Sequence, residues 1–128
     1  MSTSTEGGTI RITGIDMSSY LVKDTDRAIA FYRDVLGLEP TTVYPNGGGA
    51  EYELGDGATF GLFNPGDMFP WQKGNGVMFA VEDFDGAVRA VKERGTPIHM
   101  QQEFPVCFMA MTEDSEGNQV ILHKRKTS

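Results

Sequence analysis

Few side chains in this sequence of 128 residues could carry acid–base chemistry or bind a metal. There are two histidines, His99 and His123, and His123 lies on a short apolar run, NQVILH, where an imidazole could act as a general base. Glu51 and Glu53 alternate along the strand-like run AEYEL, so they share one face of it. No spacing typical of a nucleophile–base pair or of a metal site joins these groups. The catalytic residues are therefore unknown from sequence, and His123 is the candidate.

The remaining composition excludes several classes of partner. Eleven Lys and Arg against eighteen Asp and Glu give a net charge of −7, which argues against nucleic acid and anionic membranes. No apolar run approaches the roughly 18 residues that a membrane span needs, and MSTSTEGGT has no signal-peptide pattern. The single cysteine, Cys107, cannot form an internal disulfide and is predicted to be a small buried side chain. We expect a cytoplasmic protein.

The elements that must position these groups occur twice along the chain. The run IDMSSYLV predicts a strand, and KDTDRAIAFYRDVLG predicts a helix that begins after Asp24 and ends near Gly37. Three strand-like runs follow. The same order recurs from GVMFAVED, with a helix in FDGAVRAVKERG that ends at Gly95, and three more strands in TPIHMQ, PVCFMAMTED and NQVILHK. Aligning the two helical segments places Asp24 on Asp83. The chain is therefore predicted to be two βαβββ units of about sixty residues each.

The predicted boundaries follow from this duplication. Residues 1–8 are small and polar, and we expect a disordered tail there. One domain then covers residues 9–128. Within it, the first unit spans about 12–64, the Gly/Pro-rich loop spans 65–75, and the second unit spans about 76–125.

The doubled unit resembles the vicinal oxygen chelate superfamily, which includes glyoxalase I, extradiol dioxygenases, and fosfomycin- and bleomycin-resistance proteins. The resemblance covers about residues 12–125. It rests on RAIAFYRDVLGLEP after the first strand and on the pattern D-x-x-G-N-x-x-x-L-H around the last one. It implies an α+β fold in which each unit is a curved mixed half-barrel sheet with one helix on its convex face. It does not imply one activity, because this scaffold hosts several.

In the metalloenzymes of this superfamily, four His or Glu side chains from the first and last strand of each unit chelate a divalent cation. Carrying these positions over gives Met17, Gly61, Gly76 and Ile121. None of the four side chains binds such a cation, and shifting the alignment by one residue adds only Asp16. The resemblance therefore implies no metal and no cofactor here, and it disfavours metal-dependent glyoxalase and dioxygenase chemistry.

Strand alternation predicts which side chains share a cavity with these four positions. The two glycines are expected to enlarge the cavity, or alternatively to relieve crowding in the sheet. Phe69 and Trp71, in the loop between the units, are expected to stack on a planar ligand or to seal a dimer interface. The predicted ligand-binding residues are Met17, Ser19, Glu51, Glu53, Gly61, Phe63, Phe69, Trp71, Gly76, Met78, Ile121 and His123.

These observations favour a metal-independent protein that sequesters an aromatic or cationic small molecule, similar to the bleomycin-resistance branch. The alternative is an enzyme on the same scaffold, such as a lyase, an isomerase or a dioxygenase-like protein. It would use His123 or a glutamate as acid or base. Members with two units in one chain commonly form homodimers whose sites take one unit from each subunit, so we expect a homodimer. The ligand's identity does not follow from the sequence.

Overall fold

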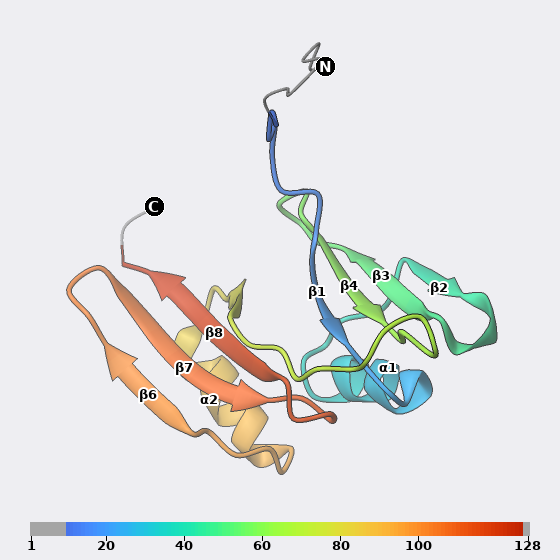
Figure 1. Ribbon diagram of the computed structural model, residues 1–128. Coiled ribbons are helices and arrows are strands. Elements are labelled where there is room, and N and C mark those ends of the chain that lie inside the picture. The colour runs from blue at the N-terminus through green and yellow to red at the C-terminus, as the bar shows by residue number, and fades with distance from the viewer. Residues whose placement is uncertain (1–9, 127–128) are drawn as a thin grey trace.

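The computed structural model describes residues 10–126 (Figure 1). The predicted tail, residues 1–8, lies outside the described residues. Strand, helix and three strands follow one another twice, which confirms the predicted α+β class and the two tandem βαβββ units. The elements are β1 (Ser18–Leu21), α1 (Thr25–Asp34), β2 (Thr42–Tyr44), a 3-10 turn η1 (Pro45–Gly47), β3 (Gly49–Glu53), β4 (Thr59–Phe63), β5 (Val77–Ala80), α2 (Phe84–Glu93), β6 (Met100–Glu103), β7 (Cys107–Glu113) and β8 (Gln119–Arg125).

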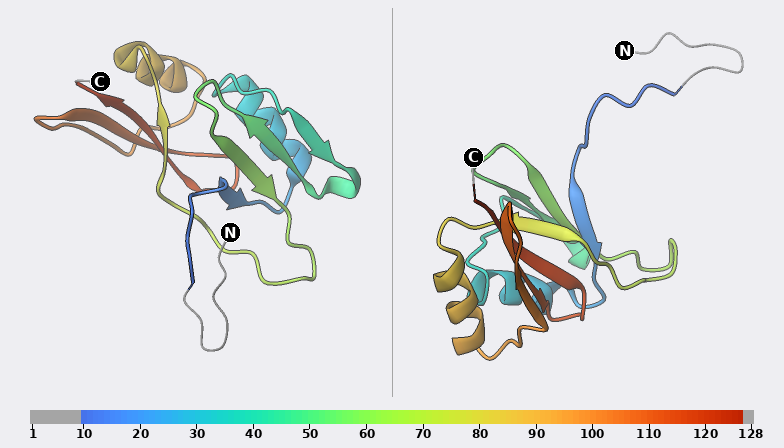
Figure 2. Two further views of the ribbon diagram at one scale, coloured as in Figure 1. Left: turned by 90° about the horizontal axis from the view of Figure 1, so that it is seen from above. Right: turned by 90° about the vertical axis from the view of Figure 1, so that its left-hand side faces the viewer.

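Each unit forms its own four-stranded mixed sheet. Sheet A has the order β1-β4-β3-β2 and sheet B the order β5-β8-β7-β6. In both sheets the first and last strands of the unit pair in parallel, and the other pairs are antiparallel. Neither sheet closes on itself. Helix α1 covers one face of sheet A and α2 one face of sheet B, which leaves the other face of each sheet without a helix (Figures 1 and 2).

The predicted helix signals are confirmed, with small shifts at some ends. The carboxylate of Asp24 accepts a hydrogen bond from the Arg27 amide (3.1 Å), and that of Asp83 accepts one from the Gly86 amide (3.0 Å). Gly95 follows Arg94, the C-cap residue of α2, and adopts a positive φ of 85°. Each described helix has ten residues, and none is long and apolar enough to cross a membrane.

Two strands differ from the sequence-based bounds. The first was expected from residue 15, but β1 begins at Ser18, which pairs with Phe60 near the start of β4. Residues before Met17 therefore have no neighbouring strand to pair with. The strand expected in TPIHMQ begins at Met100 instead, where its pairing with Met111 starts. Pro97, which has no amide hydrogen to contribute to a ladder, lies outside it.

The helix-covered faces of the two sheets meet between the units. Phe60 of sheet A packs edge-on against Phe79 of sheet B, with ring centroids 4.9 Å apart. Val120 of β8 is fully buried in the same cluster, and Val77 packs against it. The buried residues of this cluster are Tyr20, Val22, Ala28, Tyr32, Ala50, Tyr52, Phe60, Leu62 and Val120. A second buried cluster lies under α2 and is made of Phe84, Val88, Val91, Ala110 and Leu122. Because alternate strand residues point to opposite faces, the uncovered faces of the two sheets point away from each other.

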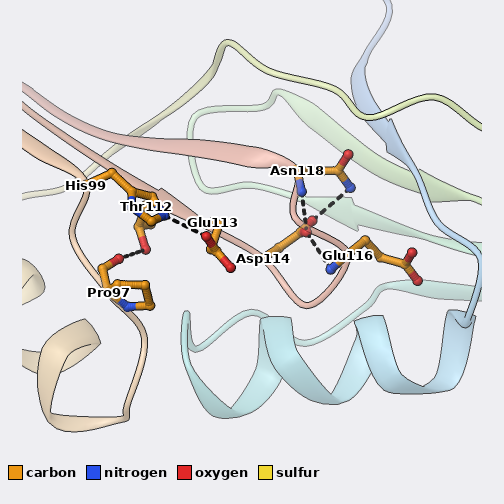
Figure 3. Close-up of polar contacts among 7 residues, drawn as sticks. All are labelled: Pro97, His99, Thr112, Glu113, Asp114, Glu116 and Asn118. Atoms are coloured by element: carbon orange, nitrogen blue, oxygen red, sulfur yellow. Dashed lines mark hydrogen bonds and ion pairs between the residues drawn. The ribbon is translucent and has the colours of Figure 1, made fainter.

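A turn at residues 114–118 connects the two units through hydrogen bonds. Asp114 Oδ1 accepts hydrogen bonds from the amides of Glu116 and Asn118, which shape the turn (Figure 3). The amide nitrogen of the Asn118 side chain donates to the Leu21 carbonyl (3.1 Å), and its oxygen accepts from the Gly74 amide (2.7 Å). Asn118 is fully buried, so these bonds between β1, the inter-unit loop and β8 are shielded from water.

The same turn also binds the first helix. Tyr32 of α1 donates its hydroxyl hydrogen to Asp114 Oδ2 at 2.8 Å, in the core. Glu116 Oε2 accepts from the amides of Lys23 and Asp24, at 2.9 and 2.8 Å, just before α1 begins. The turn between the last two strands of sheet B is therefore also the main polar contact with the first unit.

Tyr20 links the two units in a different way. Its hydroxyl accepts a hydrogen bond from the Val77 amide (3.1 Å) and donates one to the Gln119 carbonyl. A side chain of sheet A thus connects β5 and β8 of sheet B at the point where their pairing begins. Burial raises the pKa of Tyr20 to about 12, and the charge of Asp114 adds to the rise while the Val77 bond opposes it. Burial also raises the pKa of Tyr52 to about 12.

Replacing Asn118 by alanine tests the inter-unit network. Asn118→Ala removes three side-chain hydrogen bonds, those with Leu21, Gly74 and Asp114. It leaves the Gly74 amide unpaired, whereas the Leu21 carbonyl keeps the bond from the Trp71 indole. We expect the free energy of unfolding to fall by about 2–4 kcal/mol, measured by urea denaturation. Asn75→Ala, at an exposed position in the same loop, is the matched control and should change stability by less than about 0.5 kcal/mol. Equal effects of the two substitutions would contradict the role given to Asn118.

The raised tyrosine pKa values predict a loss of stability at alkaline pH. Because Tyr20 and Tyr52 ionise more readily in the unfolded chain, their contribution is fully present below pH 10. It is lost as the pH rises from 10 towards about 12. Urea midpoints measured across this range should therefore decrease, and Tyr20→Phe should flatten the decrease. A midpoint that stays constant over the range would show that these hydroxyls are not shielded as the structure places them.

Candidate ligand-binding site

Six of the predicted site residues lie together on or beside the uncovered face of sheet A. The register places Ser19 beside Gly61, and Gly61 beside Glu51 on the next strand. Glu53 lies beside Thr59 one pair further along the same face, and Thr59 Oγ1 donates to its carboxylate. The six residues are Met17, Ser19, Glu51, Glu53, Gly61 and Phe63.

The space beside Gly61 is filled by neighbouring apolar groups. A Cβ at this position would lie 2.7 Å from Cε2 of the Phe63 ring and 3.3 Å from the sulfur of Met17. Met17 and Gly61, two of the positions carried over from the metalloenzymes, are therefore adjacent. The sequence suggested that Gly61 enlarges a cavity. It does not, because the Phe63 ring folds back over the glycine. Phe63 in turn stacks on Tyr44, with centroids 5.9 Å apart.

Glu51 carries the negative charge at the centre of this face. Tyr44, on the neighbouring strand, donates its hydroxyl hydrogen to Glu51 Oε2. Glu51 is partly buried whereas Glu53 is exposed. The two carboxylates therefore lie on the same face of β3, with the stacked rings of Tyr44 and Phe63 on the Glu51 side.

The uncovered face of sheet B is lined by methionines. Met78, Ile121, Met111 and Met100 form one row across its four strands, since each is paired with the next. The adjacent row consists of Ala80, His123, Met109 and Gln102. Ile121 is buried, and Met78 is 51% exposed. Sequence reasoning found Met78, Ile121 and His123 but missed Met100, Met109 and Met111, although Met109 and Met111 alternate visibly in CFMAMTE.

Gly76, the fourth position carried over from the metalloenzymes, precedes β5 with a φ of 97°. Nothing lies within 4 Å of where its Cβ would stand. Its positive φ explains the glycine by backbone conformation, because L side chains rarely adopt this region. Open space at this position adjoins the start of the methionine face.

The predicted site residues thus fall on two faces that point in opposite directions within one chain. Val77 and Phe79 point into the core, and Met78 and Ala80 alternate with them and point outward. On sheet A, Phe60 points into the same core and Gly61 points outward. One chain therefore does not enclose a cavity between these two faces. The expectation that a homodimer builds each site from two chains stays a prediction.

The aromatic residues of the inter-unit loop differ in their surroundings. The indole nitrogen of Trp71 donates to the Leu21 carbonyl at 3.0 Å, and the Lys23 ammonium lies 4.2 Å from the ring centroid. One face of Trp71 is therefore already occupied by a cation. Phe69 is 47% exposed. Of the two aromatic residues, Phe69 is the one whose ring has more surface available to a ligand or a partner.

The imidazole that is paired with a carboxylate is His99 rather than His123. His99 Nε2 lies 2.6 Å from Glu113 Oε1, and both side chains are about half exposed (Figure 3). A small cleft of about 160 Å³ beside them is lined also by Lys73, Asn75 and Gln119. His123 lies on the methionine face between Ala80 and Met109 and is partly buried. Cys107 is buried in β7, as predicted from its type.

A further cleft lies where the two units meet, and Met78 and Ala80 of the uncovered face of sheet B are among its lining residues. It has a volume of about 510 Å³ and separates β5 from the β3–β4 hairpin and from the end of α1. Most of its lining is apolar, and Asp56 is the one charged side chain among the lining residues. Sequence reasoning did not find this cleft, because it arises only where the two units meet.

The side chains present do not fit the divalent metal centre of the related enzymes. The four corresponding positions hold the thioether of Met17, the aliphatic side chain of Ile121 and two glycines, which have no side chain to bind a metal. Among residues 10–126, no three His, Cys, Asp or Glu side chains are grouped closely enough to hold a metal ion. Met17, Phe63 and Ile121 instead give these positions an apolar lining.

The family described as the Glyoxalase/Bleomycin resistance protein/Dioxygenase superfamily matches residues 14–122. The chain belongs to this superfamily. The match covers both units, including β1, both helices and the 114–118 turn that joins the units. No curated protein sequence matches the chain at a significant level.

Solved structures share the fold at low sequence identity. TnmS3, an antibiotic binding protein from Streptomyces sp. CB03234, is 21% identical over 92% of this chain and 100% of its own, with a TM-score of 0.77. Lactoylglutathione lyase from Agrobacterium tumefaciens is 23% identical over 88% of this chain and 94% of its own, with a TM-score of 0.73. A superfamily member from Sphaerobacter thermophilus DSM 20745 is 24% identical over 88% and 98%, with a TM-score of 0.72.

A methyl group at Gly61 tests how the site beside it is filled. Gly61→Ala should displace the Phe63 ring from Tyr44 and lower the free energy of unfolding by about 1 kcal/mol. The cost stays modest because an aromatic ring can rotate away. Near-ultraviolet circular dichroism should change with the loss of the Tyr44–Phe63 stack. Gly55→Ala, where an added Cβ has no neighbour within 4 Å, is the control. An unchanged spectrum in Gly61→Ala would count against the packed arrangement.

Proposed function

We propose that this protein binds a planar aromatic or cationic small molecule without a metal ion and sequesters it between two copies of the chain. The observation that carries this proposal is the replacement of all four metal-ligand positions, together with the apolar surfaces that now line them. Such a surface favours ligands that are bound by contact area and a few polar anchors, rather than substrates that need a Lewis acid.

The methionine face of sheet B supports an aromatic ligand. Met78, Met100 and Met111 lie in one cross-strand row with Ile121, and Met109 stands beside them. Thioethers are polarizable and flexible, so they adapt to a flat ring system and make favourable contacts with its edge. A ligand lying along this row would cover side chains that are otherwise partly exposed to water.

The uncovered face of sheet A supports a positive charge on the ligand. Glu51 and Glu53 stand along β3, and Tyr44 and Phe63 stack beside Glu51. Aromatic faces and carboxylates both attract cations. The net charge of −7 acts in the same direction over a longer range.

A homodimer would bring the two faces into one cavity. Sheet A of one copy would face sheet B of the other, and a two-fold axis would create two equal sites. Met78 and Phe69 are large apolar side chains that a single chain leaves about half exposed. Covering them lowers the apolar area in contact with water, which favours association.

The structural neighbours include a binding protein and an enzyme. One is described as antibiotic binding and another as a lyase. The similarity to TnmS3 supports the binding proposal, since it covers the whole of that chain. An acid–base enzyme is the second candidate, and the hydrogen bond between His99 and Glu113 is the observation that favours it. Among the described residues, His123 forms no hydrogen bond with a carboxylate that would support its predicted acid–base role.

Calorimetric titration with proflavine, a planar cation, tests the proposal. We expect binding that is the same with and without EDTA. Glu51→Gln should weaken it about tenfold, which corresponds to about 1.4 kcal/mol. Met111→Ser should weaken it as well, by removing apolar contact. Glu82→Gln, at an exposed position outside both faces, is the matched control and should leave the affinity unchanged.

Three further measurements complete this test. Plasma mass spectrometry should find substoichiometric metal in the purified protein, and light scattering at micromolar concentration should find a dimer. Anthraquinone-2-sulfonate, a planar anion, should bind more weakly than proflavine if the carboxylates contribute. Stoichiometric metal that is required for binding, or affinities that ignore both site variants, would contradict the proposed function.

A further inference from the structure

Sulfur-containing side chains alternate along a central strand of sheet B. Strand β7 lies between β6 and β8 (Figure 1). Ala110 of β7 and its partner Leu122 are buried under α2, so the odd-numbered residues of β7 lie on the uncovered face. In the run CFMAM these residues are Cys107, Met109 and Met111. A thiol and two thioethers therefore share one face of one strand.

The neighbouring strands add two more side chains that can bind a metal ion. Met109 is paired with His123 of β8, and Met111 is paired with Met100 of β6. All four of these residues are partly buried. Among the hydrogen bonds of the described residues, none uses the ring nitrogens of His123. The residue on its other side is Ala80, which has the smallest side chain of this row.

The spacing of these groups suits a single ion. Two residues of an extended strand rise about 6.8 Å, which sets the separation of the Met109 and Met111 Cβ atoms. A metal–sulfur bond is about 2.3 Å long, so two sulfurs on one ion stand at most about 4.6 Å apart. Each sulfur lies two bonds beyond its Cβ, so side-chain rotation closes the difference. Directly paired residues have Cβ atoms about 5 Å apart, which brings His123 within reach of an ion between the two thioethers.

The ligand types select the kind of ion. Thioether sulfur is a soft ligand that favours Cu⁺, and imidazole also suits copper. The two cross-strand rows that contain Met109 and Met111 hold no carboxylate, which hard divalent cations prefer. The net charge of −7 favours a cation over an anion.

We propose that Met109, Met111 and His123 bind one soft monovalent cation, Cu⁺ or its analogue Ag⁺, through two sulfurs and one nitrogen. Met100 is within reach as a fourth ligand, since it is paired with Met111. None of the four positions carried over from the metalloenzymes takes part. The site is therefore a different one from their divalent metal centre, in both position and ligand chemistry.

This site goes beyond the proposed function, and the two can fail separately. An aromatic ligand needs the apolar area of the methionine face, whereas a soft cation needs its sulfur atoms. Both occupants use the same face, so they are alternatives there. Cu⁺ is oxidised in air and thioethers hold Cu²⁺ poorly, so protein purified in air should carry little metal in either case.

Calorimetric titration with silver nitrate in chloride-free buffer tests the site, because Ag⁺ binds like Cu⁺ but keeps its oxidation state. The background is Cys107→Ser, which removes the one thiol of the chain and keeps every thioether. We expect this variant to bind one Ag⁺ per chain. Adding Met109→Leu or Met111→Leu should weaken binding at least about tenfold, since losing a ligand costs no less than losing the partner of a ligand. Leucine keeps the apolar volume of methionine, so the fold and the proflavine affinity should change little.

Two more variants and a second probe sharpen the test. Met68→Leu, in the same background, is the matched control, because it removes a thioether that is 81% exposed in the inter-unit loop. It should leave the Ag⁺ affinity unchanged. His123→Asn should weaken binding as the two leucine variants do. Transfer of Cu⁺ from its bicinchoninate complex under nitrogen, followed by absorbance, should rank the variants in the same order.

The outcomes separate the possibilities. Loss of silver binding in Cys107→Ser would overturn the proposal, because the thiol would then be the site. Equal affinities of Met109→Leu, Met111→Leu and the control would overturn it as well. Weakened silver binding in the two leucine variants, with proflavine still bound, would support a sulfur site separate from the proposed ligand site. Silver binding by a chain that does not bind proflavine would support this site and contradict the proposed function.

Discussion

The hydrogen bonds of the 114–118 turn fix the relative position of the two units, and the other features of the molecule depend on that position. Asn118 and Asp114 bond to β1, to the inter-unit loop and to Tyr32 of α1, all in a buried environment. Buried polar groups are costly when unpaired, so this network tolerates one arrangement of the units and penalises others. Tyr20 adds a bond to each of β5 and β8 from the opposite side.

This arrangement packs the helix-covered faces of both sheets against each other and directs the other faces outward. A single chain thereby buries Phe60 against Phe79 but leaves Met78 in contact with water. It also leaves β5 with a free edge, since the two sheets share no hydrogen-bonded strand pair. The two consequences have the same cause, the way in which the two units pack against each other.

The replacement of the metal ligands changes the chemistry of the site more than its shape. Met17 and Gly61 are adjacent, at positions where related enzymes carry ligands, but the Phe63 ring fills the space between them. On sheet B, Ile121 is flanked by Met78 and Met111. Such surfaces offer dispersion and sulfur–aromatic contacts in place of a Lewis acid. In the proposed function, the carboxylates of Glu51 and Glu53 supply polar anchors from the uncovered face of sheet A.

The sequence by itself determined the features that depend on short-range patterns. Asp24 and Asp83 marked the helix starts, and the strand alternation in TFGLF placed Gly61 and Phe63 on one face, where the Phe63 ring does lie beside Gly61. Only the tertiary structure decided where those faces point, because that depends on contacts such as Tyr20 with Gln119, 99 residues apart in the chain. The same reason explains the Phe63 ring over Gly61, the Lys23 cation on Trp71 and the methionine row across four strands. A local pattern fixes the side of a strand on which a residue lies, but the neighbours it meets there are set by segments that the pattern does not contain.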